Sequence, residues 1–306
     1  MSSQRLDGRV FVVTGGGRGL GEATAIELGR HGATVVVNDL GVSLSGDDEG
    51  DVGDDPAETT VEAVREAGGE AAAHLGDVSS FEYTAELVDD VVDEHGRLDG
   101  LVNYAGILRD GISYKMSPDD FDAVVNVHLR GHFCLLRNAA AHWRERAGET
   151  DDGALDTQRS FVSVVSPAIW GNPGQVNYAS AKAGVLGLTR TAAIELSRLN
   201  VRVNALMPLG FTRMVEAIPE DKRGVDPEDI PPEKVAPVAA YLLSDAATDV
   251  TGCTIRAAGN EVGVVSNPEI VRRGYDTDGW SLDDLAEHFE SDVASGVDLD
   301  RSAREF

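Results

Sequence analysis

The chain has 306 residues, of which 42% are apolar, enough to build a sizeable core in one large domain or two small ones. With 53 acidic and 26 basic residues its formal net charge is −27, which argues against nucleic acid or anionic membranes as partners. No apolar run approaches the roughly 20 residues of a membrane span, and Met1–Arg9 has no apolar signal core, so a cytoplasmic location is expected.

Short β-branched runs alternate with helical stretches along the chain, the pattern of a parallel sheet covered by helices on both faces. The predicted strands are Val10–Val13, Thr34–Asn38, Ala71–Leu75, Gly100–Asn103, Ser160–Val165, Arg202–Leu206 and Thr254–Ala257. Neither an internal repeat nor a second composition regime interrupts this order. The sequence therefore predicts a single doubly wound α/β domain over residues 1–265.

Helix start and stop signals lie between these strands. Asp55 stands before a proline at the first helical position, and Gly68 ends that helix. Ser80 opens a helix that runs to Gly96, and Ser117 opens a third. In the third, the helical period predicts these residues on the core side: Phe121, Val124, Val125, His128, Leu129 and His132.

Two insertions, residues 41–54 and 147–158, are acidic and are predicted to be solvated loops. The first follows the second strand and is placed to fold over a site at that strand's end. The tail, residues 266–306, contains one expected helix, Ser281–Phe289. An aromatic residue before it, Trp280, leads us to expect that the tail docks on the same domain.

The first strand runs into a glycine-rich turn, Thr14–Gly21, and a helix is expected from near Glu22. Glycines allow the backbone to turn tightly and approach a pyrophosphate at the positive end of that helix. The second strand ends at Asp39, whose carboxylate can accept both hydroxyls of an adenosine ribose. The same charge disfavours the 2′-phosphate of NADP. Together these features predict NAD as the cofactor.

Tyr178 and Lys182 stand four residues apart, so on a helix their side chains share one face. A free phenol loses its proton near pH 10, and a neighbouring ammonium lowers that pKa. Such a pair can act as the general base of alcohol oxidation, or as the acid of ketone reduction.

In this order and spacing, the glycine-rich turn, Asp39, Asn103–Gly106 and the Tyr178/Lys182 pair resemble the short-chain dehydrogenase/reductase family over residues 7–265. Within it, Val35–Gly41, Gly106–Asp110, Val127–Gly131 and Gly171–Gln175 are similar to the (3R)-hydroxyacyl-CoA dehydrogenase portion of the peroxisomal multifunctional β-oxidation enzyme. The resemblance implies a Rossmann-type oxidoreductase of fatty acid metabolism. It would move a hydride between NAD and a secondary alcohol or ketone, a (3R)-3-hydroxyacyl or 3-oxoacyl thioester in the leading interpretation.

Two alternatives stay open: a dehydrogenase of another secondary alcohol, such as a sugar or steroid, and a non-catalytic dinucleotide-binding protein. The resemblance also implies a homodimer or homotetramer packed through residues 118–144 and 176–198. The substrate would be CoA-linked and therefore polyanionic. Arg109 and Arg130 are the candidates for a basic patch that would receive it. Solvation at the surface is the other interpretation of both arginines.

The resemblance also implies roles for single residues. Tyr178 would be the acid/base, and Lys182 would hold the nicotinamide ribose and lower the pKa of Tyr178. Residues expected at the cofactor are Gly15, Arg18, Gly19, Leu20, Gly21, Asp39, Asp77, Val78, Asn103, Tyr178, Lys182, Pro208 and Thr212. Among them Arg18 is a residue type that NADP-using relatives often carry. Asp39 outweighs it, because its carboxylate would face the ribose 2′-position.

Three positions depart from the family pattern. Tyr104 replaces an amide, which is expected to change packing rather than binding. His128 replaces an asparagine of a proton relay, and it is either a relay or a core histidine. Val165 aligns with the catalytic serine. We assign the serine role to Ser166, brought towards Tyr178 by a bulge at the strand's end, ahead of Ser163 and of no hydroxyl at all.

The charge and the cysteines complete the interpretation. Carboxylates in excess and only four lysines are typical of proteins from salt-accumulating halophiles, and an ordinary acidic protein is the alternative. Cys134 and Cys253 lack any CxxC partner, so they are expected to be small buried residues rather than a disulfide or zinc site.

Overall fold

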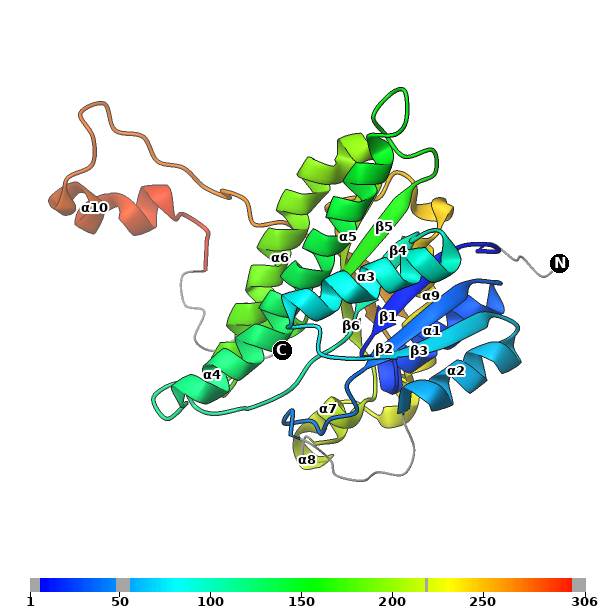
Figure 1. The fold of residues 1–306 in the computed structure, drawn as a ribbon. Helices are drawn as coiled ribbons and strands as arrows, with labels where there is room; N and C mark the ends of the chain where they lie inside the picture. Colours follow the sequence, from blue (N-terminus) through cyan, green and yellow to red (C-terminus); the bar gives the residue numbers. More distant parts are fainter. Residues whose placement is uncertain (1–5, 48–55, 218–219, 299–306) are drawn as a thin grey trace. The chain divides into compact units, whose positions relative to one another are not determined.

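A computed structural model of the chain describes residues 6–47, 56–217 and 220–298 (Figure 1). The chain divides into two compact units, residues 1–265 and residues 266–306. In the first unit, one sheet has the strand order β3-β2-β1-β4-β5-β6-β7-β8. The strands are β1 Val10–Thr14, β2 Thr34–Asp39, β3 Glu70–Leu75, β4 Gly100–Asn103, β5 Arg159–Val164, β6 Val201–Leu209, β7 Thr254–Ala258 and β8 Glu261–Val265.

All neighbouring strands pair in parallel except β7 and β8, which are antiparallel. The seven predicted strands are present, with ends shifted slightly along the chain. Strand β8 was not predicted; it is an edge strand whose valines Val262 and Val264 are both exposed. Strand order reverses between β1 and β4, and this switch point is where ligands bind in Rossmann-like sheets.

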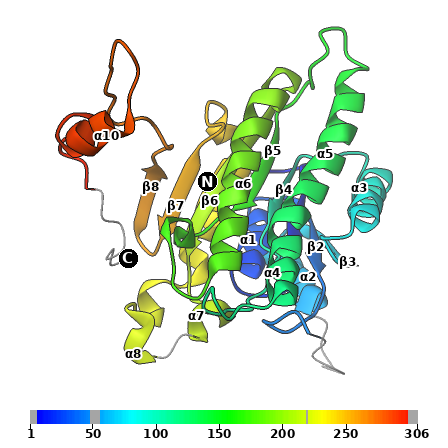
Figure 2. The same ribbon diagram turned by 90° about the vertical axis from the view of Figure 1, so that its left-hand side faces the viewer.

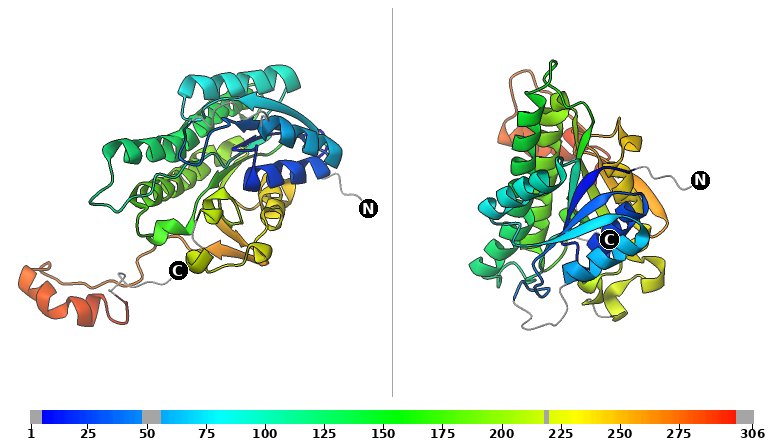
Figure 3. Two further views of the ribbon diagram at one scale, coloured as in Figure 1. Left: turned by 90° about the horizontal axis from the view of Figure 1, so that it is seen from below. Right: turned by 45° about the vertical axis from the view of Figure 1, so that its right-hand side comes forward.

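Helices cover both faces of the sheet (Figure 2, Figure 3). One face carries α1 Gly19–Arg30, α2 Pro56–Ala67 and α9 Ala236–Leu243, whose apolar residues share one core with the sheet. The other carries α3 Phe81–His95, α5 Gly131–Ala147 and α6 Val176–Leu196. Helix α4, Pro118–Val125, continues through a π-helical segment, Asn126–Arg130, into α5. Two short helices, α7 Arg213–Glu216 and α8 Glu220–Arg223, follow β6.

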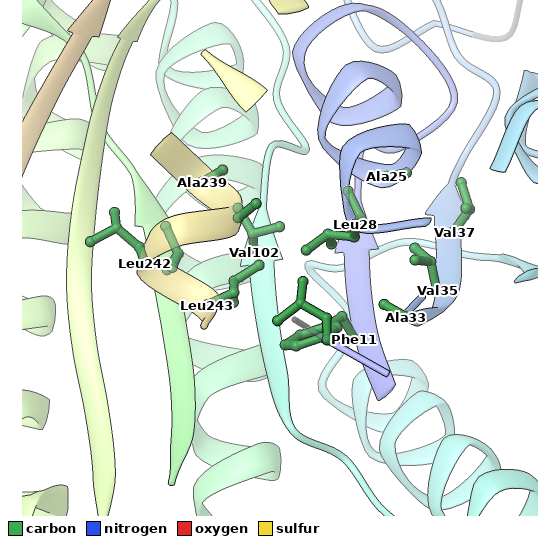
Figure 4. Close-up of a cluster of buried hydrophobic side chains, with 14 of the residues drawn as sticks. Phe11, Ala25, Leu28, Ala33, Val35, Val37, Val102, Ala239, Leu242 and Leu243 are labelled. Atoms are coloured by element: carbon green, nitrogen blue, oxygen red, sulfur yellow. The ribbon is translucent and has the colours of Figure 1, made fainter. Parts of the chain in front are cut away.

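The two cores consist of large apolar side chains on strands and helices. In the first, Phe11 of β1 and Leu28 of α1 are fully buried, and Leu243 of α9 lies next to Phe11 (Figure 4). In the second, the indole of Trp143 is fully buried, and its Nε1–H donates to the carbonyl of Leu98 at 2.9 Å. Burying side chains of this size removes enough apolar surface from water to hold the layers together.

The predicted helix caps are confirmed at two places. The hydroxyls of Ser80 and Ser117 each accept a backbone N–H three residues on, at 3.1 Å, and Gly96 ends α3 with φ 74°. Asp55 lies outside the described residues. Two expectations were wrong: α1 begins at Gly19 rather than near Glu22, and Phe121 is exposed rather than core-facing.

A buried carboxylate joins distant segments at the amino end of the sheet. Asp99, before β4, is almost fully buried and is ion-paired with Arg9 (3.3 Å), Arg97 (2.7 Å) and Arg159 (3.1 Å). Arg9 also reaches Asp245 at 2.6 Å. A buried charge is tolerated only when it is paired in this way.

The described part of the first insertion, residues 41–47, is hydrogen-bonded to the segment after β4. The N–H of Leu108 donates to the carbonyl of Leu44 at 2.8 Å, and Nε of Arg109 donates to the carbonyl of Ser45 at 2.9 Å. Residues 48–54 lie outside the described residues. In the second insertion Leu155 is buried, so this loop is not wholly solvated as expected.

In the second unit the predicted helix is present as α10, Leu282–His288, with a capping box between Ser281 and Asp284. Docking of the tail on the first unit stays a prediction. Across the described parts of both units, no helix is both long and apolar enough to cross a membrane.

Candidate active site

The glycine-rich turn follows β1 at the switch point of the sheet. Gly15 has φ +60°, and a Cβ there would lie 2.6 Å from the backbone nitrogen of Ala105. A Cβ on Gly21 would lie 2.1 Å from the carbonyl oxygen of Gly15. The turn is therefore packed so tightly that only glycine fits, with the first N–H groups of α1 beside it. This is the geometry that receives a pyrophosphate.

Asp39, at the end of β2, lies against this turn. One carboxylate oxygen accepts the N–H of Gly17 and the other accepts the N–H of Gly41, both at 2.9 Å. A Cβ on Gly17 would meet the Asp39 carboxylate at 2.9 Å, so glycine also allows this approach. The carboxylate is thus fixed beside the turn, where a ribose joined to the pyrophosphate would lie.

The chain beyond β6 returns to the same turn. Thr212 lies against Gly19, where an added Cβ would be 3.3 Å from the threonine methyl group, and Gly210 packs on Leu20. Pro208 is near the end of β6, and Thr212 precedes α7. The structure therefore brings Thr212 against the glycine-rich turn, whereas Pro208 pairs with Ala257 of β7 in the sheet.

Three further predicted residues serve the local structure. The Asp77 carboxylate accepts the N–H and the hydroxyl of Ser79, each at 2.8 Å, and Val78 is buried beside Gly131. Asn103 is fully buried, and its Oδ1 accepts from the Thr14 hydroxyl at 2.6 Å. Its side chain holds β1 to β4, so a ribose could be reached there only by the backbone.

Tyr178 and Lys182 share one face of the first turns of α6, as predicted. Nζ of Lys182 lies 5.6 Å from the centre of the Tyr178 ring and donates to the carbonyl of Val164 at 2.7 Å. Burial lowers the pKa of Lys182 to about 7, because the charged ammonium loses its hydration. The β5 carbonyl thus fixes the amine beside the phenol.

The three positions around the missing serine are clearly separated. Val165 is buried among apolar residues that include Val185 and Met207. The hydroxyl of Ser163 is hydrogen-bonded to Thr189 at 2.9 Å. Since Thr189 lies 11 residues beyond Tyr178 on α6, about 16 Å along the helix, Ser163 is far from the phenol.

Ser166 alone of these reaches the phenol. Its hydroxyl oxygen accepts the N–H of Ala168 at 3.2 Å and caps a 3₁₀ turn, Pro167–Trp170, which leaves the hydroxyl hydrogen for Tyr178. The expected bulge is absent from the described strand: β5 ends at Val164 and Ser166 is extended, with φ −149°. The turn after the strand brings the hydroxyl towards Tyr178.

Burial and two neighbouring groups act on the ionisation of Tyr178. Burial raises the pKa of Tyr178, the hydrogen bond with Ser166 lowers it, and the Asp110 carboxylate raises it. The His128 ring meets the Tyr178 ring edge to face, with centroids 4.9 Å apart. Nε2 of His128 lies 2.8 Å from the carbonyl of Ile107, while its buried Nδ1 has no hydrogen-bond partner among the described residues.

The remaining candidates have structural contacts. The Tyr104 hydroxyl is hydrogen-bonded to Thr24 at 2.9 Å, so this residue joins β4 to α1. Arg109 contacts the carboxylates of Asp47 (3.5 Å) and Asp120 (3.8 Å). Nε of Arg130 donates to the carbonyl of Ser79 at 2.9 Å. Both arginines therefore have protein partners, and they form no open basic patch.

Comparison with known proteins agrees with this geometry. A family model described as Enoyl-(Acyl carrier protein) reductase matches residues 15–259. The chain is 42% identical over 284 residues to the hydroxyacyl-CoA dehydrogenase ChsB1 of Mycobacterium tuberculosis, covering 91% of this chain and 86% of the relative. It is 39% identical to the peroxisomal multifunctional enzyme type 2 of Drosophila melanogaster, covering 83% of this chain and 40% of that enzyme.

A solved structure is similar over the same range. The crystal structure of a short chain dehydrogenase from Mycobacterium avium has a TM-score of 0.79 and 36% identity, covering 94% of each chain.

Proposed function

The chain belongs to the short-chain dehydrogenase/reductase family, and we propose that it interconverts a (3R)-3-hydroxyacyl thioester and the 3-oxoacyl thioester with NAD. It is an oxidoreductase that binds a nicotinamide dinucleotide. The observation that carries the proposal is the meeting of Tyr178, Lys182 and Ser166 at the same edge of the sheet as a turn that only glycine can form. Relatives named for hydroxyacyl-CoA chemistry support the acyl substrate.

The protein's own groups have distinct tasks in the proposed reaction. In the oxidation direction, ionised Tyr178 takes the hydroxyl proton of the substrate, and in the reduction direction it returns that proton. The Ser166 hydroxyl, joined to Tyr178, would hold the substrate oxygen at the same point. Lys182 holds its amine beside the phenol, and when protonated that amine favours the ionised form of Tyr178. A nicotinamide dinucleotide held by the glycine-rich turn and Asp39 would supply the hydride chemistry.

The turn and Asp39 fit the cofactor. Gly15 and Gly21 leave room that any Cβ would fill, and the Asp39 carboxylate is held at the end of β2. Those residues would hold the pyrophosphate and the adenosine ribose, respectively. A fixed negative charge near the ribose 2′-position supports NAD over NADP, because a phosphate there would be repelled.

The function is tested with a panel of substrates at molar KCl, comprising (3R)- and (3S)-3-hydroxyacyl-CoA, simple secondary alcohols and sugars. We expect turnover of the (3R)-thioester above all others. Tyr178→Phe should lower kcat by about 100-fold or more, because only the proton-transfer group is removed. NADH binding, followed by fluorescence, should be unchanged. A sugar or simple alcohol turned over faster than the thioester would contradict the substrate, and near wild-type activity of Tyr178→Phe would contradict the mechanism.

Cofactor choice is tested at Asp39. Wild-type enzyme should have a higher kcat/KM with NAD than with NADP, and Asp39→Asn should narrow that ratio about tenfold or more, by removing the charge while keeping an oxygen acceptor. Because Asp39 also accepts from Gly17 and Gly41, the melting temperature of the variant must be compared with that of wild type. A wild-type preference for NADP would refute this choice.

A further inference from the structure

We infer that His132 is a positioning residue for Lys182, acting through the peptide groups of Val164. This rests on the proposed role of Lys182 in the reaction. His132 is fully buried near the start of α5, between the ends of β4 and β5. Its two ring nitrogens lie against backbone groups of His128 and Val164, which neighbour Tyr178 and Lys182 respectively.

The contacts of His132 determine its tautomer. Nδ1 lies 2.6 Å from the carbonyl oxygen of His128, and Nε2 lies 3.2 Å from the backbone nitrogen of Val164. A carbonyl can only accept and a backbone N–H can only donate, so Nδ1 carries the proton and Nε2 accepts. The amide nitrogen of Asn103 lies 3.0 Å from the same Nδ1. The opposite tautomer would suit that contact but would break both backbone bonds.

Val164 connects this histidine to the amine. Its N–H is held by Nε2 of His132, and its carbonyl accepts from Nζ of Lys182 at 2.7 Å. Val164 is the last residue of β5, after which the chain leaves the sheet towards Ser166. On the β6 side the sheet still supports this end, since the N–H of Val165 donates to the carbonyl of Leu206 at 2.8 Å. On the β4 side the pairing ends at Ser163, so there the bond from His132 takes over and fixes the orientation of Val164, and therefore the place of the amine.

The same histidine also holds the π-helical segment. The His128 carbonyl that accepts from Nδ1 belongs to the residue whose ring packs on Tyr178. Segments of π-helix are frequent at functional sites, where they re-aim a side chain. One imidazole therefore joins the backbone behind Tyr178 to the backbone that holds Lys182. His132 therefore helps to position both His128 and Lys182, the two neighbours of Tyr178.

Burial and a neighbouring charge keep the His132 ring neutral, in the tautomer that its contacts require. Burial, and then the charge of Lys182, hold the pKa of His132 well below its usual range, so the ring stays neutral and Nε2 stays an acceptor. The groups that face Lys182 are Tyr178 on its own helix, His128 on the π-helical segment and His132 on α5. Asp110 acts on Tyr178 from the segment after β4.

Two amide substitutions separate the two contacts of the ring. In His132→Gln the side-chain amide extends as far from Cβ as Nε2, so it can accept from Val164 while losing the bond to His128. In His132→Asn it extends only as far as Nδ1, so it keeps the bond to His128 and loses Val164. His132→Phe fills the same space with no polar atom and loses both.

We expect His132→Gln to keep kcat within about threefold of wild type, and His132→Asn and His132→Phe to lose about tenfold to 100-fold, since displacements near 1 Å can have that effect. The rate of alcohol oxidation should rise with pH as Tyr178 ionises. In the two impaired variants this rise should move to higher pH, because the amine, which favours ionised Tyr178 when it is protonated, is no longer held beside the phenol. Loss of packing alone would lower the melting temperature without this shift.

The controls keep the outcomes distinct. His142→Phe changes a histidine of the same helix that lies nearly three turns further along, and it should leave kcat and the pH profile unchanged. Lys182→Met tests the proposed role of Lys182 in the reaction, on which the inference rests. If this variant retains wild-type activity, the role of Lys182 and the inference about His132 are both wrong. If Lys182→Met is inactive but His132→Asn equals His132→Gln in kcat and pH profile, only the inference is overturned. If His132→Phe does not fold, the difference in kcat and pH profile between His132→Gln and His132→Asn still tests the inference.

Discussion

Ser166 has two hydrogen bonds that use different parts of one hydroxyl. Its oxygen accepts the N–H of Ala168, and its hydrogen is left for the phenol oxygen of Tyr178. The first bond holds the side chain in place, because it caps the turn that ends β5. The second stabilises the ionised phenol more than the neutral one, and so opposes the effect of burial on the pKa of Tyr178.

The serine assignment is tested by two variants. Ser166→Ala should lower kcat by about 100- to 1,000-fold, as expected when an oriented donor at a developing charge is removed. Without that donor the pKa of Tyr178 rises, so the residual rate of oxidation should reach its plateau at higher pH than in wild type. Ser163→Ala, whose hydroxyl contacts Thr189 instead, is the matched control and should keep full activity. Equal activity of both variants would mean that neither hydroxyl is needed.

Single residues also show how far sequence reasoning reached. Tyr178 and Lys182 could be paired from their spacing alone, because a helix fixes which side chains share a face. Ser166 could be proposed because the proline after it restricts its backbone, although a turn rather than a bulge brings its hydroxyl towards Tyr178. His132 was predicted only to face the core. Its partners are backbone atoms of β5 and the π-helical segment, and no sequence pattern brings those together.

At the scale of elements, the helices were easier to predict than the edge of the sheet. Caps at Ser80 and Ser117 are local signals, and the structure has both. The strand β8 has exposed valines and only β7 as a neighbour, so its residues are held by tertiary pairing that the sequence does not display. The error at Phe121 has a different source. The helical period identifies an apolar position, but not whether the chain's own core or another subunit covers it.

Exposed apolar side chains on α4, α5 and α6 support the predicted homo-oligomer. Phe121 is 36% exposed, Phe133 is 50% exposed and Ile194 is 78% exposed. We expect a dimer or tetramer at molar KCl, and Ile194→Glu should shift it towards monomer by placing a charge among apolar side chains. Light scattering gives the mass. The control is Leu75→Glu on β3, 62% exposed and on another element, which should keep the wild-type mass. A wild-type chain of monomer mass would refute the assembly.

For the whole molecule, the net charge of −27 is the dominant quantity. Repulsion between surface carboxylates opposes the compact state, and molar salt shortens the screening length to about 3 Å. Pairs that are buried, such as Asp99 with its three arginines, are screened much less. Added salt should therefore relieve the unfavourable interactions on the surface while leaving this internal cluster intact.

The expected result is that the melting temperature and the activity both rise from dilute buffer to molar KCl. Sucrose at equal osmolality is the control, since it stabilises by exclusion from the surface and screens no charge. A melting temperature that is flat or falls with KCl would leave the ordinary acidic protein as the better interpretation of the composition.

The cluster around Asp99 also bears on how the chain folds during synthesis. Its arginines stand at positions 9, 97 and 159, and Asp245 joins through Arg9, so the ion pairs close only when widely separated segments have left the ribosome. In the sheet, β4 lies between β1 and β5, and an emerging chain that stops before β5 has one side of β4 uncovered. The carboxylate of Asp99 would then lack its ion pair with Arg159. We therefore expect the nascent amino-terminal half to remain incompletely folded until β5 has been translated, and then to fold in one step.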